Sequence, residues 1–79
     1  MERVKRINEA FNYLRNKGLI RTQKDLANLM HAAESNISKA LKGDEAILTD
    51  RFLRRLSAAF GGIFNQEWLL TGEGEMLCA

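Results

Sequence analysis

TQKDLANLMHAAESNISKALKG, residues 22–43, contains two short helical patterns separated by a turn. Thr22 is a good N-cap residue, and Asp25 three positions later completes a weaker form of the capping box. These signals predict a helix from Gln23 to about Met30. The side chains expected on its buried face are Leu26, Ala27 and Met30. Residues 31–33 leave room only for a short turn before the second pattern begins.

The second pattern, residues 34–42, has an apolar inner face and a polar outer face. Its inner positions show helical spacing and comprise Ile37, Ala40 and Leu41. Outer positions 35, 36 and 38 hold Ser, Asn and Ser, which are poorer helix formers than Ala, Leu, Glu or Lys. Helix stability therefore does not account for the choice of these residues.

Short hydroxyl and amide side chains on the outside of a helix can form hydrogen bonds with phosphates and with base edges. Lys39 can reach guanine O6 and N7 or a phosphate, and Glu34 can accept a hydrogen bond from cytosine N4. Two short helices joined by a short turn, the second polar on its outside, form the arrangement that places the second helix in the major groove. The sequence thus predicts a helix-turn-helix whose recognition helix spans about residues 34–42.

Patterns on both sides of this motif predict three more helices and an all-α fold. Residues 2–17 carry an apolar stripe that stops at Gly18, and the stripe comprises Val4, Ile7, Phe11 and Leu14. Thr49 is expected to cap a helix that ends at Gly61 and Gly62. Its inner face comprises Phe52, Leu53, Leu56 and Phe60, and its outer face comprises Arg51, Arg54 and Arg55. Arg54 and Arg55 are interpreted as a solvated face.

A short last helix is expected to begin at Asn65 and to carry Trp68, Leu69 and Leu70. Trp68, with its aromatic and aliphatic neighbours Phe60, Ile63 and Phe64, is interpreted as core rather than as a base-stacking platform.

Composition and charge favour a small protein with a polyanionic partner. The 79 residues suffice for one domain and leave little room for an enclosed active site. Residues 1–42 carry nine Lys or Arg against four acids, a charge of +5, whereas residues 43–79 carry three against six, a charge of −3. The basic face is therefore expected in the first half, although a solvated basic surface accounts for the charge equally well.

The sequence also predicts where the protein resides. No apolar run approaches the roughly 18 to 20 residues of a membrane span. The basic N-terminus is not followed by the apolar stretch of a signal peptide, and the single Cys78 cannot form an internal disulfide. These features favour a cytoplasmic protein in which Cys78 is inert.

Three runs together resemble a known family. Residues 22–43, then FLRRLSAAFG (52–61) and EWLLTGEG (67–74), resemble the lambda-repressor-like helix-turn-helix family (Cro/CI type) of phage and bacterial repressors. In that family a Gln opens the second helix, an Ala four residues later lies where two helices touch, and an apolar residue anchors the third helix. Gln23, Ala27 and Ile37 fill these places, and the closing motif Trp-Leu-Leu-x-Gly matches residues 68–72.

The chain departs from the family pattern in its turn and in its loops. His31 stands where the family usually has Gly, and the loops before the fourth and fifth helices are longer than in compact members. His is enriched among the non-glycine residues found at positive φ, so the turn is expected to survive. We interpret His31 as structural, because a zinc site needs several ligands.

The resemblance implies a compact five-helix DNA-binding domain and sequence-specific binding to double-stranded operator DNA. Gln23 would touch a phosphate and brace the start of the recognition helix, and Glu34, Ser35 and Lys39 would read base edges. Asn36, Lys42 and Arg51 fall at or near phosphate-contacting places. The full set expected at the DNA is Thr22, Gln23, Glu34, Ser35, Asn36, Ser38, Lys39, Lys42 and Arg51.

The alternative is a helical protein-interaction module, of adaptor or antitoxin type, that has the same fold without DNA binding. Glu34 favours this alternative, because an acid at the first reading position repels phosphates, whereas the basic first half favours DNA. An enzyme is not expected, because the sequence has no Ser-His-Asp set, no paired carboxylates and no phosphate-binding glycine loop. We expect no cofactor, no metal, no small-molecule ligand and no membrane partner.

We expect residues 1–72 to form the DNA-binding domain, and we interpret residues 73–79 as a tail that starts a linker in a longer repressor. Dimerisation on a palindromic operator would place half-sites about 34 Å apart. The apolar contacts expected to be exposed for it are Phe64, Leu70, Met76 and Leu77. Such a patch is smaller than the roughly 800 Å² per partner of a standard interface, so the homodimer is expected to be weak without DNA.

Overall fold

The computed structural model describes residues 2–78 and contains five α-helices. They are α1 (Arg3–Asn16), α2 (Gln23–Met30), α3 (Glu34–Leu41), α4 (Asp50–Ala59) and α5 (Gln66–Thr71). Their bounds agree with the predicted helices, which confirms the all-α class and the order of the elements. The radius of gyration is 11.2 Å, and about 11.6 Å is expected for a compact domain of this length.

Local hydrogen bonds explain where the helices begin and end. The Thr49 hydroxyl accepts from the Phe52 amide at 3.2 Å, and the Asn65 carboxamide oxygen accepts from the Glu67 amide at 3.1 Å. Both residues therefore act as the predicted N-caps of α4 and α5. At the other end of α1, Gly18 takes a φ of 74° and the chain leaves the helix there.

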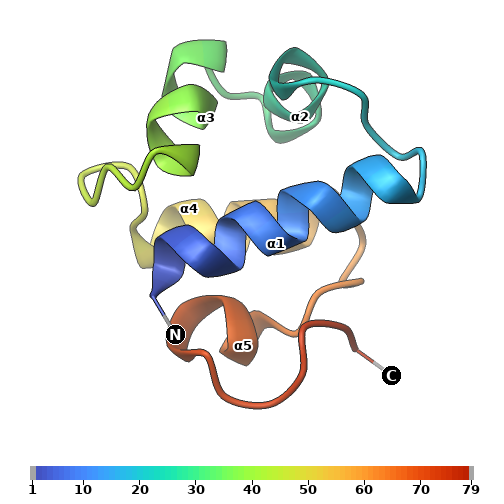
Figure 1. The fold of residues 1–79 in the computed structure, drawn as a ribbon, viewed down its shortest axis with the longest axis vertical. Helices are drawn as coiled ribbons and strands as arrows, with labels where there is room; N and C mark the ends of the chain where they lie inside the picture. The colour runs from blue at the N-terminus through green and yellow to red at the C-terminus, as the bar shows by residue number, and fades with distance from the viewer. Residues whose placement is uncertain (1, 79) are drawn as a thin grey trace.

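The helices enclose a single core. In Figure 1, α2 and α3 form one end of the molecule and α5 forms the other. α1 packs against α3 and α5, and α4 packs against α2 and α5, so these two longer helices connect the ends. The predicted inner residues of each helix are buried or half-buried, and two loop residues that the patterns did not mark, Ile20 and Leu48, are buried as well.

The C-terminal segment folds back onto the domain. Phe64 and Leu77 form an antiparallel β-bridge, in which the Asn65 amide donates to Met76 O and the Cys78 amide donates to Ile63 O, each at 2.8 Å. The Cys78 thiol also donates to Phe64 O at 3.4 Å. Residues 76–78 are therefore held against the start of the α5 region.

This pairing corrects the predicted apolar patch. Phe64 is only 1% exposed, and its ring contacts the Tyr13 and Phe60 rings edge to face, with centroids 6.0 and 6.3 Å away. Leu70, Met76 and Leu77 are half-buried and pack against the core. The prediction that Phe64 is exposed for dimerisation is wrong, because residues 76–78 pair with residues 63–65 and cover it, whereas Leu70, Met76 and Leu77 stay partly accessible and the homodimer stays a prediction.

Candidate nucleic-acid interface

The start of α2 is built by a capping box. The Asp25 amide donates to Thr22 Oγ1, and the Asp25 carboxylate accepts from the Thr22 amide, each at 3.3 Å. The same carboxylate accepts from the Arg21 amide at 2.9 Å. Thr22 is exposed, and Gln23 follows it as the half-buried first residue of the helix. The cap thus holds Gln23 at the N-terminal end of α2.

A left-handed residue joins α2 to α3. His31 has φ 55° and ψ 44°, and it is the one non-glycine residue at positive φ in the described part of the chain. The turn closes where the Ala32 amide donates to Ala27 O at 2.9 Å, and Ala27 is buried. The expectation that His31 sustains the turn in place of Gly is confirmed.

α3 has one buried face and one polar face. Ile37 and Ala40 are fully buried, and Gly43 ends the helix with a φ of 95°. On the outer face Glu34, Ser35 and Lys39 are exposed, and Asn36 and Ser38 are half-buried. The Glu34 carboxylate lies in the first turn of the helix, where a negative charge is also favoured by the helix dipole.

The outer face of α3 carries five polar side chains. Within residues 2–78, none of the side chains at positions 34, 35, 36, 38 and 39 forms a hydrogen bond or an ion pair. The N-cap residue Ala33 also offers no side-chain hydrogen bond to the helix. The outer face of α3 therefore presents donors and acceptors that the fold itself does not use.

The remaining two predicted site residues lie at different places. Lys42 is the exposed C-cap of α3, so it continues the polar face of that helix. Arg51 is exposed near the start of α4, which packs against α2 and α5. The structure thus gathers residues 34–42 on one element, whereas Arg51 belongs to a separate helix.

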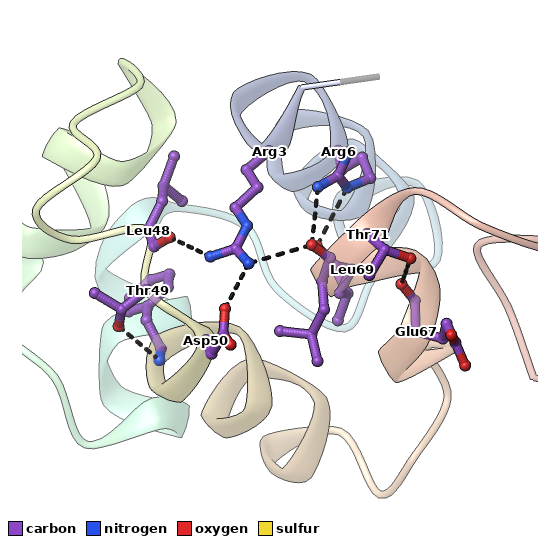
Figure 2. Close-up of polar contacts among 10 residues, drawn as sticks. Arg3, Arg6, Leu48, Thr49, Asp50, Glu67, Leu69 and Thr71 are labelled. Atoms are coloured by element: carbon purple, nitrogen blue, oxygen red, sulfur yellow. Dashed lines mark hydrogen bonds and ion pairs between the residues drawn. The ribbon is translucent and has the colours of Figure 1, made fainter.

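Two cations of the basic first half are used inside the fold, which the sequence did not reveal (Figure 2). Arg3 pairs with Asp50 at 2.5 Å and donates to Leu48 O at 2.8 Å and to Leu70 O at 3.2 Å. Arg6 is only 3% exposed, and its Nε donates to Leu69 O at 3.2 Å. Burial lowers the pKa of Arg6 from its usual value, and the nearby charge of Arg3 lowers it further. The two guanidinium groups stabilise the C-terminal end of α5 rather than an external surface.

Two further side chains connect the α2–α3 pair to the rest of the protein. The Asn8 amide nitrogen lies 2.7 Å from Val4 O and 2.9 Å from Leu41 O, at the end of α3. Arg55 is exposed, as interpreted from the sequence, and its guanidinium also donates to Met30 O at 2.6 Å and to His31 O at 3.2 Å. Asn8 follows Val4 by four positions and so lies on the apolar face of α1. A polar side chain on that face was a signal from which the sequence could have identified Asn8.

Among residues 2–78, no three His, Cys, Asp or Glu side chains are grouped so that they could hold a metal ion. None of the helices in that range has the length and apolar character needed to cross a membrane.

No protein-family model, no curated protein and no solved structure matches the chain.

Proposed function

We propose that this protein binds double-stranded DNA sequence-specifically, as a helix-turn-helix regulator of the lambda-repressor-like type. α2 and α3 would form the motif, and α3 would lie in the major groove. The observation that carries the proposal is the outer face of α3, whose polar side chains have no partner within the described chain. An ordinary solvated helix would favour better helix formers at those positions.

The dimensions and chemistry of α3 support this proposal. An α-helix with its side chains is about 10 to 12 Å in diameter, and the major groove, which is about 12 Å wide, admits one. Ser35 and Lys39 lie four positions apart on the same exposed face, so both can approach base edges together. Gln23 and Lys42 would contact the phosphates on either side, which fixes the position of α3 along the duplex.

The test is a selection of bound sequences from a random DNA pool, using the parent chain, Ser35→Ala and Lys39→Ala. A lost base contact penalises only the sequence that offered its partner, by about 1 to 3 kcal/mol, so each variant should prefer a different set of sequences. Arg54→Ala is the matched control, because Arg54 is an exposed cation on the α4 surface beside α5. It should leave the preference unchanged.

The protein-interaction module remains the second candidate, and Glu34 is the observation that favours it. An exposed carboxylate at the start of α3 repels phosphates unless it meets a base donor. Identical base preferences in all folded proteins of the selection would mean that α3 does not read the bases, and no selected sequence at all would replace the DNA-binding proposal with this one.

A further inference from the structure

The two side chains that reach the α2–α3 pair from other helices suggest how its orientation is set. Asn8 comes from α1 and contacts the last residue of α3, and Arg55 comes from α4 and contacts the last residue of α2 and the turn. Both bonds connect distant parts of the chain, 33 residues apart for Asn8 and Leu41 and 25 for Arg55 and Met30. The α2–α3 pair is therefore held at two separate points.

The first point fixes the C-terminal end of α3 against α1. The half-buried Asn8 amide bridges Val4 O and Leu41 O, so it satisfies a carbonyl that the end of a helix leaves without an intrahelical partner. Close packing adds to this bond, because a Cβ at Gly43 would lie 3.2 Å from Val4 Cγ2. A side chain at position 43 would therefore crowd Val4, whereas Gly43 lets the end of α3 lie close to α1 and the Asn8 hydrogen bond keeps it there.

The second point fixes the turn against α4. The Arg55 guanidinium donates through Nη2 to two consecutive carbonyls, Met30 O and His31 O, where α2 ends and the chain changes direction. A cation at this position also interacts favourably with the dipole of α2. Because α3 begins directly after the turn, a shift of the turn would swing α3 relative to α2.

We propose that Asn8 and Arg55 are positioning residues for sequence discrimination, which they control without contacting DNA. This inference rests on the proposed function of α3. Base contacts need hydrogen-bond geometry, whereas phosphate contacts act largely through charge and tolerate small displacements. Loss of either bond should therefore weaken binding to the preferred sequence and leave binding to unrelated DNA intact.

The experiment compares Asn8→Ala and Arg55→Met with matched controls on the same helices. Asn12→Ala removes an exposed amide from α1, and Arg54→Met removes an exposed cation from α4. For each protein, the dissociation constant is measured for the selected sequence and for a shuffled duplex, over a range of salt concentrations and well below the melting temperature. Arg55→Lys tests whether a shorter side chain that keeps the positive charge restores part of the effect.

We expect Asn8→Ala and Arg55→Met to lower the ratio of specific to nonspecific affinity about five- to tenfold, the equivalent of one net hydrogen bond. Nonspecific affinity and its salt dependence should match those of the respective control, and Arg55→Lys should lie between the parent and Arg55→Met. A side chain that only stabilises the fold would lower the melting temperature and leave the ratio unchanged.

The inference fails if both variants keep the parental ratio, or if Arg55→Met loses no more discrimination than Arg54→Met. If one variant does not fold, the other still tests it, because the two bonds lie at opposite ends of α3. Failure of the proposed function is recognised separately, since the parent chain itself would then not distinguish the selected sequence from the shuffled one.

Discussion

At the scale of single residues, His31 lies in the turn before α3 and Lys42 is the C-cap residue after it. His31 adopts a left-handed conformation that costs an L residue conformational energy, and the closing of the turn between α2 and α3 offsets that cost. Lys42 is exposed just after the last turn of α3, where its charge also interacts favourably with the helix dipole. The first residue acts on stability, and the second is expected to act on DNA binding.

His31→Gly should stabilise the protein by about 0.5 to 1 kcal/mol, because Gly adopts positive φ without a steric cost. His31→Val should destabilise it, since a β-branched side chain is poorly tolerated in this region. Urea denaturation of the three proteins measures the difference. Equal stability of the Gly and Val variants would contradict the role given to this turn.

Lys42→Ala should weaken binding to all DNA sequences about equally, because a phosphate contact carries little sequence information. The slope of log affinity against log salt concentration should become shallower by roughly 0.9, the value for one released counterion. Titrations at several salt concentrations measure this slope, with Arg54→Ala as the control that should not change it. An unchanged slope for Lys42→Ala would remove this residue from the phosphate contacts.

At the scale of elements, α3 and α5 are both short but are stabilised differently. α5 has six residues, too few for stability in isolation, and it depends on the burial of Trp68 and Leu69 and on the arginines at its C-terminal end. α3 buries Ile37 and Ala40 and leaves its polar side chains unpaired. α5 thus completes the core, and α3 presents a surface.

Trp68→Ala should cost about 3 to 5 kcal/mol of unfolding free energy, the usual range for truncating a buried aromatic side chain. Trp68 is only 5% exposed, so little of this loss can be recovered by solvation. Gln66→Ala, an exposed change on the same helix, should stay within about 0.5 kcal/mol. A loss below about 1 kcal/mol for Trp68→Ala, measured by denaturant titration, would mean that α5 adds little to the core.

At the scale of the whole molecule, the two ends have different roles. The domain measures 29 × 27 × 18 Å, and the α2–α3 pair lies at the end opposite α5 and the C-terminal segment (Figure 1). The β-bridge between Phe64 and Leu77 closes the α5 end. Among residues 2–78, the large hydrophobic side chains that remain exposed are Leu19, in the loop between α1 and α2, and Leu29, on α2.

The 79-residue chain is therefore expected to sediment as a monomer at micromolar concentration without DNA. Isolated exposed leucines do not supply the roughly 800 Å² per partner of a standard interface. Two copies are expected to assemble only on an operator with half-sites about 34 Å apart. Analytical ultracentrifugation with and without the selected duplex tests this, and a tight dimer at nanomolar concentration in the absence of DNA would contradict it.

The sequence by itself determined the helices and three of their N-caps, because these depend on interactions within a few residues, whereas the left-handed turn at His31 was expected from the family resemblance. Periodic apolar positions marked the buried faces of α1 to α5, and Thr22, Thr49 and Asn65 marked three helix starts. The exposure of Glu34, Ser35 and Lys39 on α3 follows from the same local pattern. The role of these residues at DNA stays a prediction.

Only the tertiary structure decided which polar side chains turn inward. Lys5 and Arg6 are adjacent cations in the sequence, yet Lys5 is exposed and Arg6 is buried against a carbonyl 63 residues away. Asn8 likewise forms a hydrogen bond with a carbonyl that lies far away in the sequence, that of Leu41, 33 residues later. Local periodicity cannot reveal such partners, because they arise only when the packing of the core brings α1, α3 and α5 together.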